Sequence, residues 1–263
     1  MIKISAVIHS YNNEKIIEKC LKNVSWADEI INIDMYSSDK TRNIVSKFTD
    51  KIYLCKKLKH VALSRNFGLS KATGDWILSI DVDETLSPGA EKIIKELIQN
   101  KAYDGYWFPR RNYVSSSDYL KYGYFYPDYQ LRLFRNMGNK YSGRLHENIF
   151  IPLNKTKKIQ KIKIIHDPIY SKLNSFLSFI RLSNYADIEA REIAESNISI
   201  RLIINNAVTD WMRHFYRSYI KKRGYLDGYK GFRAAMIISI YQSFIMIYAL
   251  YFRVINYENR RSA

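Results

Sequence analysis

The segment Ile77-Leu78-Ser79-Ile80-Asp81-Val82-Asp83-Glu84 decides the fold, because an apolar run ends abruptly in a group of acidic residues. A short apolar run of this kind predicts a buried strand over residues 76–80. On extended backbone, residues two apart point to the same side, so Asp81 and Asp83 can share one ligand. Such a pair suits a hard divalent cation, Mg²⁺ or Mn²⁺, with coordination positions left for phosphate oxygens. A solvated acidic turn that follows a strand would have the same sequence pattern, and is the alternative interpretation.

The hundred residues around this segment alternate between strand and helix patterns. Strands are predicted over residues 2–9, 29–35, 51–55 and 76–80, and helices over 14–23, 41–48 and 61–72, with Ser87-Pro88 opening one more. Pro88 is expected at the first helical position, where its missing N–H is harmless. The alternation predicts an α/β fold with a mostly parallel sheet flanked by helices. In such sheets ligands bind beyond the carboxyl ends of the strands, where the polar residues gather here.

The rest of the chain has a different pattern. Residues 103–167 are rich in Tyr, Phe and Arg in short alternating runs, which predict antiparallel strands and long loops. Helical patterns follow over 175–196 and 200–222, and Gly224, Gly228 and Gly231 are expected to break the chain before a last apolar segment. We therefore predict an α/β domain over residues 1–170 and a helical extension over residues 171–263.

The composition limits the classes of function. The 263 residues are 47% hydrophobic, which excludes general disorder, and two cysteines are too few for a disulfide scaffold. The 42 Lys+Arg against 25 Asp+Glu give a net charge of +17, which predicts a polyanionic partner. No zinc finger, basic zipper or RNA-binding aromatic motif is present, so we expect no specific nucleic acid. The N-terminus lacks the pattern of a secretory signal, so the expected compartment is cytoplasmic.

The C-terminal region concentrates the basic residues. Residues 201–263 contain eleven Lys+Arg and three Asp+Glu, and the basic block 221–223 follows aromatic residues such as Trp211 and Tyr216. Basic residues interleaved with aromatic ones suit an anionic membrane surface. The uncharged run 234–252 approaches the roughly 20 residues needed to span a bilayer, but contains several polar and aromatic residues. We favour a helix at the membrane surface over packing in a core or a homo-oligomer, and over a spanning helix.

Three further blocks precede the acidic segment in a fixed order. They read VIHSYNN at 7–13, IDMYSSDKT at 33–41 and ALSRNFGL at 62–69, with TGDW at 73–76 leading into the segment. The four blocks resemble family 2 glycosyltransferases of the GT-A fold. YPDYQLRLFR at 126–135, GRLHE at 143–147, IH at 165–166 and GYLDGYKGF at 224–232 resemble the branch with bacterial lipopolysaccharide-core β-1,4-glucosyltransferases.

The resemblance implies roles toward a nucleotide-sugar donor. Asp39 would contact the base, and Asp34 would contact uridine or shape its loop. Arg65 would face the donor diphosphate or sugar. The remaining implied residues are Ser10, Tyr11 and Asn13 around the nucleotide, Asp81 at the ribose or a metal-bound water, and Arg181 at the donor phosphates or on plain helix surface. His9 stands where proline is commoner in the family, and we expect it to be a packed strand-end residue.

The resemblance also implies metal ligands and a general base. Asp83 would bind the metal, and His166 is either a third ligand or a buried imidazole. Inverting transfer needs a carboxylate or His within hydrogen-bond reach of the acceptor hydroxyl. Glu147 is the first candidate, with a structural ion pair to Arg144 or Arg132 as the alternative. Asp128 is the second candidate.

Taken together, the resemblance implies a metal-dependent inverting hexosyltransferase. It would move glucose from UDP-glucose onto a lipid-linked glycan such as lipopolysaccharide core, at the inner face of the cytoplasmic membrane. A transferase for capsule or another surface polysaccharide is one alternative. A non-catalytic basic protein that binds membrane or nucleic acid is another. A nucleotidyltransferase is disfavoured, because the loop after the first strand has no glycine to hold a triphosphate.

Overall fold

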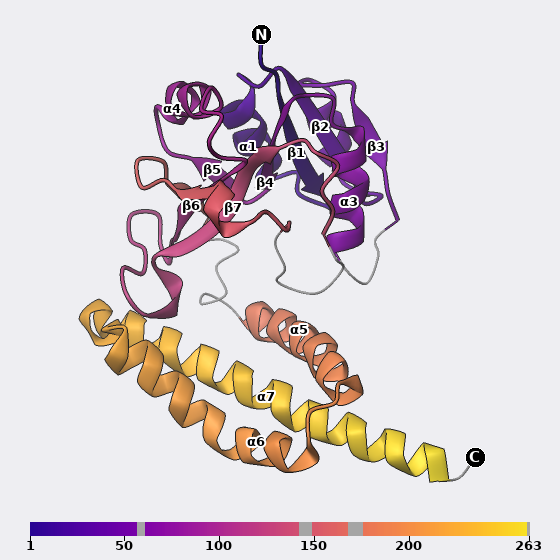
Figure 1. Cartoon of the computed structure of the whole chain (residues 1–263), viewed down its shortest axis with the longest axis vertical. Coiled ribbons are helices and arrows are strands. Elements are labelled where there is room, and N and C mark those ends of the chain that lie inside the picture. The colour runs from indigo at the N-terminus through magenta and orange to yellow at the C-terminus, as the bar shows by residue number, and fades with distance from the viewer. Residues whose placement is uncertain (57–60, 142–148, 168–175, 262–263) are drawn as a thin grey trace. The chain divides into compact units, whose positions relative to one another are not determined.

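A computed structural model describes residues 1–56, 61–141, 149–167 and 176–261. The chain forms two compact units (Figure 1). The first contains Met1–Arg110 and Asp128–His166, and the second contains Arg111–Pro127 and Asp167–Ala263. The boundary expected between residues 170 and 171 lies outside the described residues and stays a prediction. The segment Arg111–Pro127, which interrupts the first unit in sequence, belongs to the second.

The first unit contains one mixed sheet, built from nine strands within the described residues. Its parallel part has the order β3 (Ile52–Leu54), β2 (Glu29–Asp34), β1 (Ile4–Ser10) and β4 (Trp76–Asp81). These are the four strands predicted from the alternating pattern, with small shifts at their ends. The register places His9 opposite Asp81 and Ser10 opposite Asp34. The carboxyl ends of the parallel strands therefore meet at one edge, as expected.

The sheet continues with strands from the middle of the chain, which run mostly antiparallel. β7 (Asp128–Arg135) pairs with β4 and with β6 (Gly105–Asn112), and β5 (Glu84–Leu86) pairs with β9 (Ile164–His166), each pair antiparallel. β8 (Thr156–Lys158) runs parallel to β6. The sheet is mixed rather than mostly parallel, because the strands after residue 103 are not joined by helical crossovers.

Short helices accompany the sheet: α1 (Ile17–Val24), α2 (Thr41–Val45), α3 (Val61–Lys71) and α4 (Ala90–Leu97). The prediction for Pro88 was wrong, because α4 begins at Ala90 after Gly89, whose φ of 78° is left-handed. The N–H of Ala90 donates to the carbonyl oxygen of Ser87 at 3.2 Å, so Pro88 lies inside a turn that precedes the helix.

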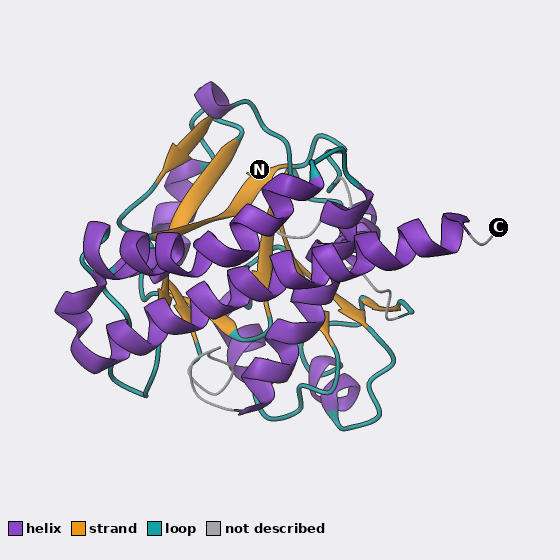
Figure 2. Ribbon diagram, turned by 90° about the horizontal axis from the view of Figure 1, so that it is seen from below, coloured by secondary structure: helices purple, strands orange, loops and turns teal. Residues whose placement is uncertain are grey.

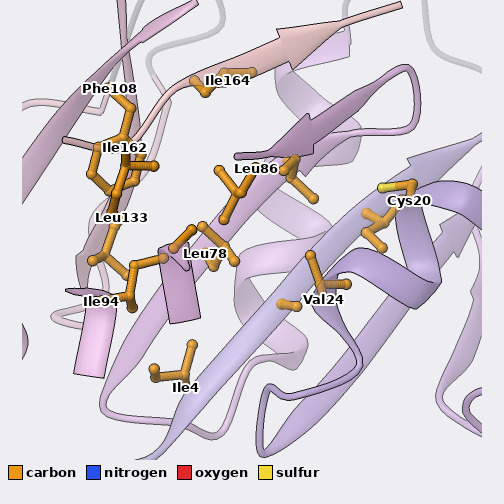
Figure 3. Close-up of a cluster of buried hydrophobic side chains, with 14 of the residues drawn as sticks. Ile4, Cys20, Val24, Leu78, Leu86, Ile94, Phe108, Leu133, Ile162 and Ile164 are labelled. Atoms are coloured by element: carbon orange, nitrogen blue, oxygen red, sulfur yellow. The ribbon is translucent and has the colours of Figure 1, made fainter. Parts of the chain in front are cut away.

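A buried core supports the parallel strands (Figure 3). Leu78 from β4, Leu133 from β7 and Ile94 from α4 are each fully buried. The ring of Trp76 stacks on that of Tyr106 with 5.7 Å between centroids. Burial of each large apolar side chain contributes about 1.5–3 kcal/mol. The end of β4 that carries the acidic residues is therefore held in a rigid frame.

Three helices dominate the second unit: α5 (Phe176–Glu195), α6 (Ile200–Phe215) and α7 (Gly228–Arg261). A π-helical turn, Tyr216–Lys221, extends α6, and a 3₁₀ turn, Gly224–Asp227, precedes α7. In Figures 1 and 2, α6 and α7 run side by side as long helices. The chain does bend near Gly224 and Gly228, but Gly231 lies inside α7, so the break expected there was wrong. The segment Gly224–Ile255 is long and apolar enough to cross a membrane by length and composition.

Polar contacts fix α7 against α5. The Arg253 guanidinium donates to the carbonyl oxygen of Ala194 from Nε at 3.0 Å and from Nη2 at 2.9 Å. It also reaches the carbonyl oxygens of Ile193, Ser196 and Ile198. These carbonyls lie at and beyond the end of α5, where helical partners are missing, so Arg253 caps that helix.

The glycine-rich block before α7 has a structural explanation. Asp227 accepts hydrogen bonds from the N–H groups of Lys121 and Tyr122, each at 2.9 Å, which ties segment 111–127 to the turn. A Cβ added to Gly231 would lie 1.9 Å from the carbonyl oxygen of Gly224. Close backbone approach therefore requires glycine at position 231, although the residue is helical.

Gly231→Ala tests this close approach, because helix propensity and steric overlap change the free energy of unfolding in opposite directions. Helix propensity alone would stabilise the protein by about 0.5–1 kcal/mol. Steric overlap with Gly224 should instead destabilise it by about 1–3 kcal/mol. Thermal and denaturant unfolding measure the sign directly. An alanine variant as stable as the parent or more stable would contradict the packing described for Gly231.

Candidate active site

The loops after β1 and β2 bind each other through side chain to backbone hydrogen bonds. The N–H of Asn12 donates to Ser37 Oγ at 2.9 Å, and Asn12 Oδ1 accepts the N–H of Ser38 at 2.8 Å. The N–H of Asn13 donates to Thr41 Oγ1 at 2.7 Å. Asn12 has a φ of 51°, a left-handed conformation that asparagine tolerates better than most residues. The two loops therefore form one polar surface at the sheet edge.

Two of the residues predicted to bind the nucleotide-sugar donor, Asp34 and Ser10, are buried beneath this surface. Asp34 is fully buried and accepts hydrogen bonds from the N–H of Ser37 at 2.8 Å and from its hydroxyl at 2.6 Å. Ser10 Oγ lies 3.0 Å from Asp34 Oδ2 and is also fully buried. Of the two roles implied for Asp34, these contacts favour shaping of the loop. Ser10 is placed to support that loop from below.

Asp39 and Tyr11, also predicted to bind the nucleotide-sugar, are more accessible to solvent. Asp39 accepts hydrogen bonds from the N–H of Glu14 at 3.1 Å and of Thr41 at 3.0 Å. Burial alone would raise the pKa of Asp39, but the hydrogen bonds from Thr41 and Glu14 outweigh it and lower that pKa. Tyr11 is 39% exposed and Tyr36 is 58% exposed, so aromatic faces flank the loops.

Asp81 lies between two arginines. Its Oδ1 is 3.0 Å from Arg65 Nη2, and its Oδ2 pairs with Arg132 Nη2. Burial would raise the pKa of Asp81, but Arg132 and Arg65, with Arg110 nearby, hold it well below the usual range. Asp81 therefore remains ionised. The donor roles implied for Arg65 and Asp81 stay predictions, and the ion pair between the two side chains was not anticipated. Sequence reasoning named Arg132 only as a possible partner of Glu147 and did not find its pairing with Asp81.

A second set of ion pairs continues this cluster. Glu84 is fully buried, and its Oε1 lies 2.7 Å from Arg132 Nη2 and 3.2 Å from Arg110 Nη1. Arg110 in turn pairs with Asp128, with 2.7 Å between Nη2 and Oδ2, and Gln130 Nε2 donates to Asp128 Oδ1 at 2.6 Å. Three arginines and three carboxylates thus form one network, defined by Arg65, Arg110, Arg132, Asp81, Glu84 and Asp128.

Asp83 pairs with His166 rather than with an arginine of this network. Their nearest atoms, Asp83 Oδ2 and His166 Nε2, are 3.4 Å apart. The register of β5 against β9, which pairs Glu84 with His166, brings the two residues together. Neighbouring ligands of one octahedral ion lie about 3 Å apart, so the pair fits a shared divalent cation. Among the described residues no group of three His, Cys, Asp or Glu side chains is arranged to hold a metal ion. Asp81, which the resemblance places at the ribose or a metal-bound water, is paired with Arg65 and Arg132.

The Arg-Asn-Phe-Gly block of α3 has packing roles beside its arginine. Asn66 exchanges two hydrogen bonds with the backbone of Tyr141, at 2.9 Å and 2.7 Å. The Arg65 guanidinium lies 5.5 Å from the centroid of the Tyr141 ring. A Cβ on Gly68 would lie 2.9 Å from Val7 Cγ1 and 3.1 Å from His9 Nε2. Gly68 therefore allows α3 to pack closely against β1, and Arg65 of the same block pairs with Asp81.

His9 is the packed strand-end residue that was expected. Its Nε2 lies 3.0 Å from the carbonyl oxygen of Ser64. Burial lowers the pKa of His9 to about 4, and the Ser64 hydrogen bond opposes this only in part. The imidazole is therefore neutral near pH 7 and donates from Nε2 to Ser64.

Two candidate residues cannot be placed. Glu147, with its neighbours Arg144 and His146, lies outside the described residues, so the proposed base stays a prediction. Arg181 belongs to α5, but its side chain is not described. The interpretation of Glu147 as an ion-pair partner of Arg132 stays untested, although Arg132 pairs with Asp81 and Glu84.

Polar and charged side chains gathered at the carboxyl edge of parallel strands define an α/β protein that binds a ligand at that edge. A family model described as glycosyl transferase family 2 matches residues 5–166, more than half of the chain, so the chain belongs to this family. It is a glycosyltransferase of the GT-A fold. This membership sets aside the alternative of a non-catalytic basic binding protein.

Relatives and solved structures agree with this assignment. The lipopolysaccharide core biosynthesis glycosyltransferase LpsC of Rhizobium meliloti is 24% identical over 254 residues, which cover 91% of this chain and 89% of LpsC. The mannosyltransferase PcManGT of Pyrobaculum calidifontis, solved with GDP-Man and Mn²⁺, has a TM-score of 0.54 at 11% identity, covering 95% of this chain and 87% of that one. TarS 1-349 of S. aureus, solved with UDP-GlcNAc, has a TM-score of 0.50 at 17% identity, with coverage of 90% and 79%. At these identities the solved structures show the fold alone.

Replacing Arg132 with methionine tests the charge network. The change would leave Glu84 buried beside one arginine instead of two, so we expect a loss of about 3–5 kcal/mol in the free energy of unfolding. Denaturant unfolding measures it, and Glu84→Gln in the same chain should recover part of the loss. The matched control is Lys95→Met, which breaks an exposed pair with Glu91 and should cost no more than about 0.5 kcal/mol. Equal effects of the two methionine variants would contradict the role given to Arg132.

The depressed pKa of His9 predicts an acid sensitivity of known sign. The unfolded chain takes up a proton near pH 6.5 and the folded chain only near pH 4. Stability from this residue is therefore complete above about pH 6.5 and falls as the pH drops toward 4, by at most about 3 kcal/mol. Unfolding measured between pH 7 and pH 4 should show a shallower decline for His9→Gln, which can still donate to Ser64. Identical pH slopes for the two proteins would refute a neutral, half-buried imidazole at position 9.

Proposed function

We propose that the chain transfers a hexose from a UDP-sugar, with UDP-glucose as the first candidate, onto a bacterial surface glycan with inversion at the sugar. The observation that carries this proposal is the arrangement at the end of β4. There Arg65 contacts Asp81, while Asp83 lies 3.4 Å from His166. The family membership, the similarity to the lipopolysaccharide core glycosyltransferase LpsC, and the structure of TarS with UDP-GlcNAc support the donor and acceptor classes.

The loops after β1 and β2, which are joined by hydrogen bonds, would bind the nucleotide. Asp39 is the accessible carboxylate there, and Tyr11 and Asn13 border the same surface. Arg65 would pair with the donor diphosphate, for which its exposed fraction of 25% leaves room. The donor phosphates would thus compete with Asp81 for the same guanidinium.

Asp83 and His166 would hold Mg²⁺ or Mn²⁺, with Asp81 as a further ligand or as a partner of a bound water. The ion would act as a Lewis acid and neutralise charge on the departing nucleoside diphosphate. Carboxylate and imidazole together are an acceptable donor set for Mn²⁺. PcManGT was solved with Mn²⁺, which supports a divalent ion for this fold.

A general base must take the proton of the acceptor hydroxyl. Glu147 remains our first candidate. Asp128 is second, since its contacts with Arg110 and Gln130 favour holding β6 and β7 together. Glu147→Gln would then abolish transfer while donor binding survives.

We assign the acceptor to a lipid-linked glycan of the lipopolysaccharide core type, reached from the cytoplasmic side of the membrane. The name of LpsC supports this choice, and the net charge of +17 suits an anionic lipid surface. A capsule or other surface polysaccharide is the alternative acceptor. A homo-oligomer is not required by any of these roles.

Calorimetric titration tests the donor and the metal together. The full chain is titrated with UDP, GDP, CMP and dTDP, each with and without Mn²⁺, and the matching nucleotide-sugars are assayed for hydrolysis. We expect selective UDP binding that needs the metal, and about a hundredfold loss of that binding in Asp83→Asn, since a metal-bound diphosphate loses several kcal/mol with its ion.

His166→Asn should weaken the same binding, whereas Glu91→Gln, on the exposed side of α4, is the matched control and should not change it. Metal-independent binding, or an unchanged Asp83→Asn, would remove Asp83 from the site. Tight binding of another nucleotide instead of UDP would overturn the donor assignment.

A further inference from the structure

The helix α6 has its polarity reversed relative to a helix on a water-exposed surface. Its inward side buries Ile203 and also the carboxylate residue Asp210, which is 3% exposed and pairs with Arg213 at 3.0 Å. Its outward side carries apolar residues, led by Val208 at 66% and Met212 at 59% exposure. The exposed apolar set, here called the α6 face, is Ile200, Leu202, Ile204, Val208, Trp211, Met212, Tyr216 and Ile220.

The spacing of these residues makes the face continuous. Ile204, Val208 and Met212 follow one another at intervals of four, so they lie above one another on one side of the helix. Tyr216 and Ile220 continue the same interval through the π-helical turn. A contiguous exposed apolar surface of this kind marks a contact with an apolar phase or partner.

The charges around the α6 face have one sign. Residues 200–223 contain six basic residues and a single acidic one, Asp210, which is buried. Arg201, Arg217 and the block Lys221-Lys222-Arg223 are exposed. The surface is therefore apolar along its length, and strongly basic at its C-terminal end.

We propose that the α6 face lies flat on an anionic phospholipid bilayer, with its apolar side chains in the headgroup boundary and the 221–223 block against the lipid phosphates. This deepens the proposed function and rests on it for the purpose of the contact, because a lipid-linked acceptor is presented at a bilayer. Trp211 and Tyr216 fit such a boundary, where amphipathic rings are favoured. Each basic residue near an anionic leaflet strengthens binding about fivefold.

A second copy of the chain fits this face less well. A two-fold dimer would place the same patch against itself, so two surfaces of the same positive sign would meet without exposed acidic partners on α6. A bilayer of anionic lipid supplies negative charge over the whole surface without requiring directional pairing.

The long apolar helix α7 is not the contact in this proposal. Its exposed residues Ile247 and Tyr251 lie in a stretch without charged residues, so anionic lipid has nothing there to attract. Arg253 also ties α7 to α5, whose Glu192 and Glu195 are exposed. A spanning α7 would draw these carboxylates toward hydrocarbon, which is costly. We therefore expect α7 to remain packed against α5 and α6 rather than to span the bilayer.

The test uses the full chain with vesicles of phosphatidylglycerol and phosphatidylethanolamine, compared with vesicles of phosphatidylcholine. Co-sedimentation measures the partition coefficient, and quenching of Trp211 by brominated lipid reports which face makes contact, with Trp211→Phe as the blank. We expect Val208→Asp with Met212→Asp to reduce partitioning into anionic vesicles at least about tenfold. Ile247→Asp with Tyr251→Asp is the matched control on α7 and should leave partitioning unchanged.

Neutralising the block by K221Q, K222Q and R223Q should reduce anionic binding about a hundredfold, toward the level on phosphatidylcholine. Loss in the α7 pair but not in the α6 pair would overturn the proposal, as would equal binding to both vesicle types. Dimerisation without lipid that the α6 substitutions abolish would assign the face to a second copy instead. UDP binding and donor hydrolysis are measured on the same variants in solution, and should be unchanged. Failure of the chemistry is thereby distinguished from failure of the membrane contact.

Discussion

Arg132, a residue only 4% exposed, pairs with one carboxylate at the end of β4 and one at the start of β5, and the rest of the site depends on it. It pairs with Asp81 and with the fully buried Glu84, while Arg110 completes the neutralisation of Glu84. Buried charges persist only when they are paired and hydrogen-bonded. The network therefore requires β4, β5, β6 and β7 to hold one relative position, and Arg65 adds α3 to the same point.

This network sorts three neighbouring carboxylates into different roles. Glu84 is engaged entirely within the protein, and Asp81 has one oxygen on each of two arginines. Asp83 takes no part in it and faces His166 across the β5–β9 pair. An acidic segment that looks uniform in sequence thus supplies a group buried among arginines, a group shared by two arginines and a group paired with a histidine. Alternation along an extended chain predicts that Asp81 and Asp83 point to the same side, but residues 82 and 83 form a turn, so the backbone is not extended between them.

Local patterns predicted the first four strands and the acidic edge, because periodicity and turn residues act over a few positions. They could not identify Arg110 and Arg132 as partners of Glu84, since alternation indicates which face a residue occupies but not which strand lies beside it. The approach of His166 to Asp83 was anticipated only through the family resemblance; its physical cause is strand register, which local sequence does not encode. The predictions for Pro88 and Gly231 were wrong for a related reason. A turn hydrogen bond from Ala90 displaced the helix start, and a backbone contact with Gly224 made glycine necessary inside a helix.

The distribution of charge separates the two surfaces of this enzyme. In the network at β4, three arginines face three carboxylates, so the site itself has little excess charge to attract a diphosphate. A divalent ion at Asp83 would provide that excess where the phosphates must lie. The net charge of +17 therefore has its origin elsewhere, and residues 201–263, with eleven basic and three acidic residues, account for eight of those charges. Since α6 buries its only carboxylate and exposes its basic and apolar side chains, this excess belongs to the surface that we propose to contact a bilayer rather than to the donor site.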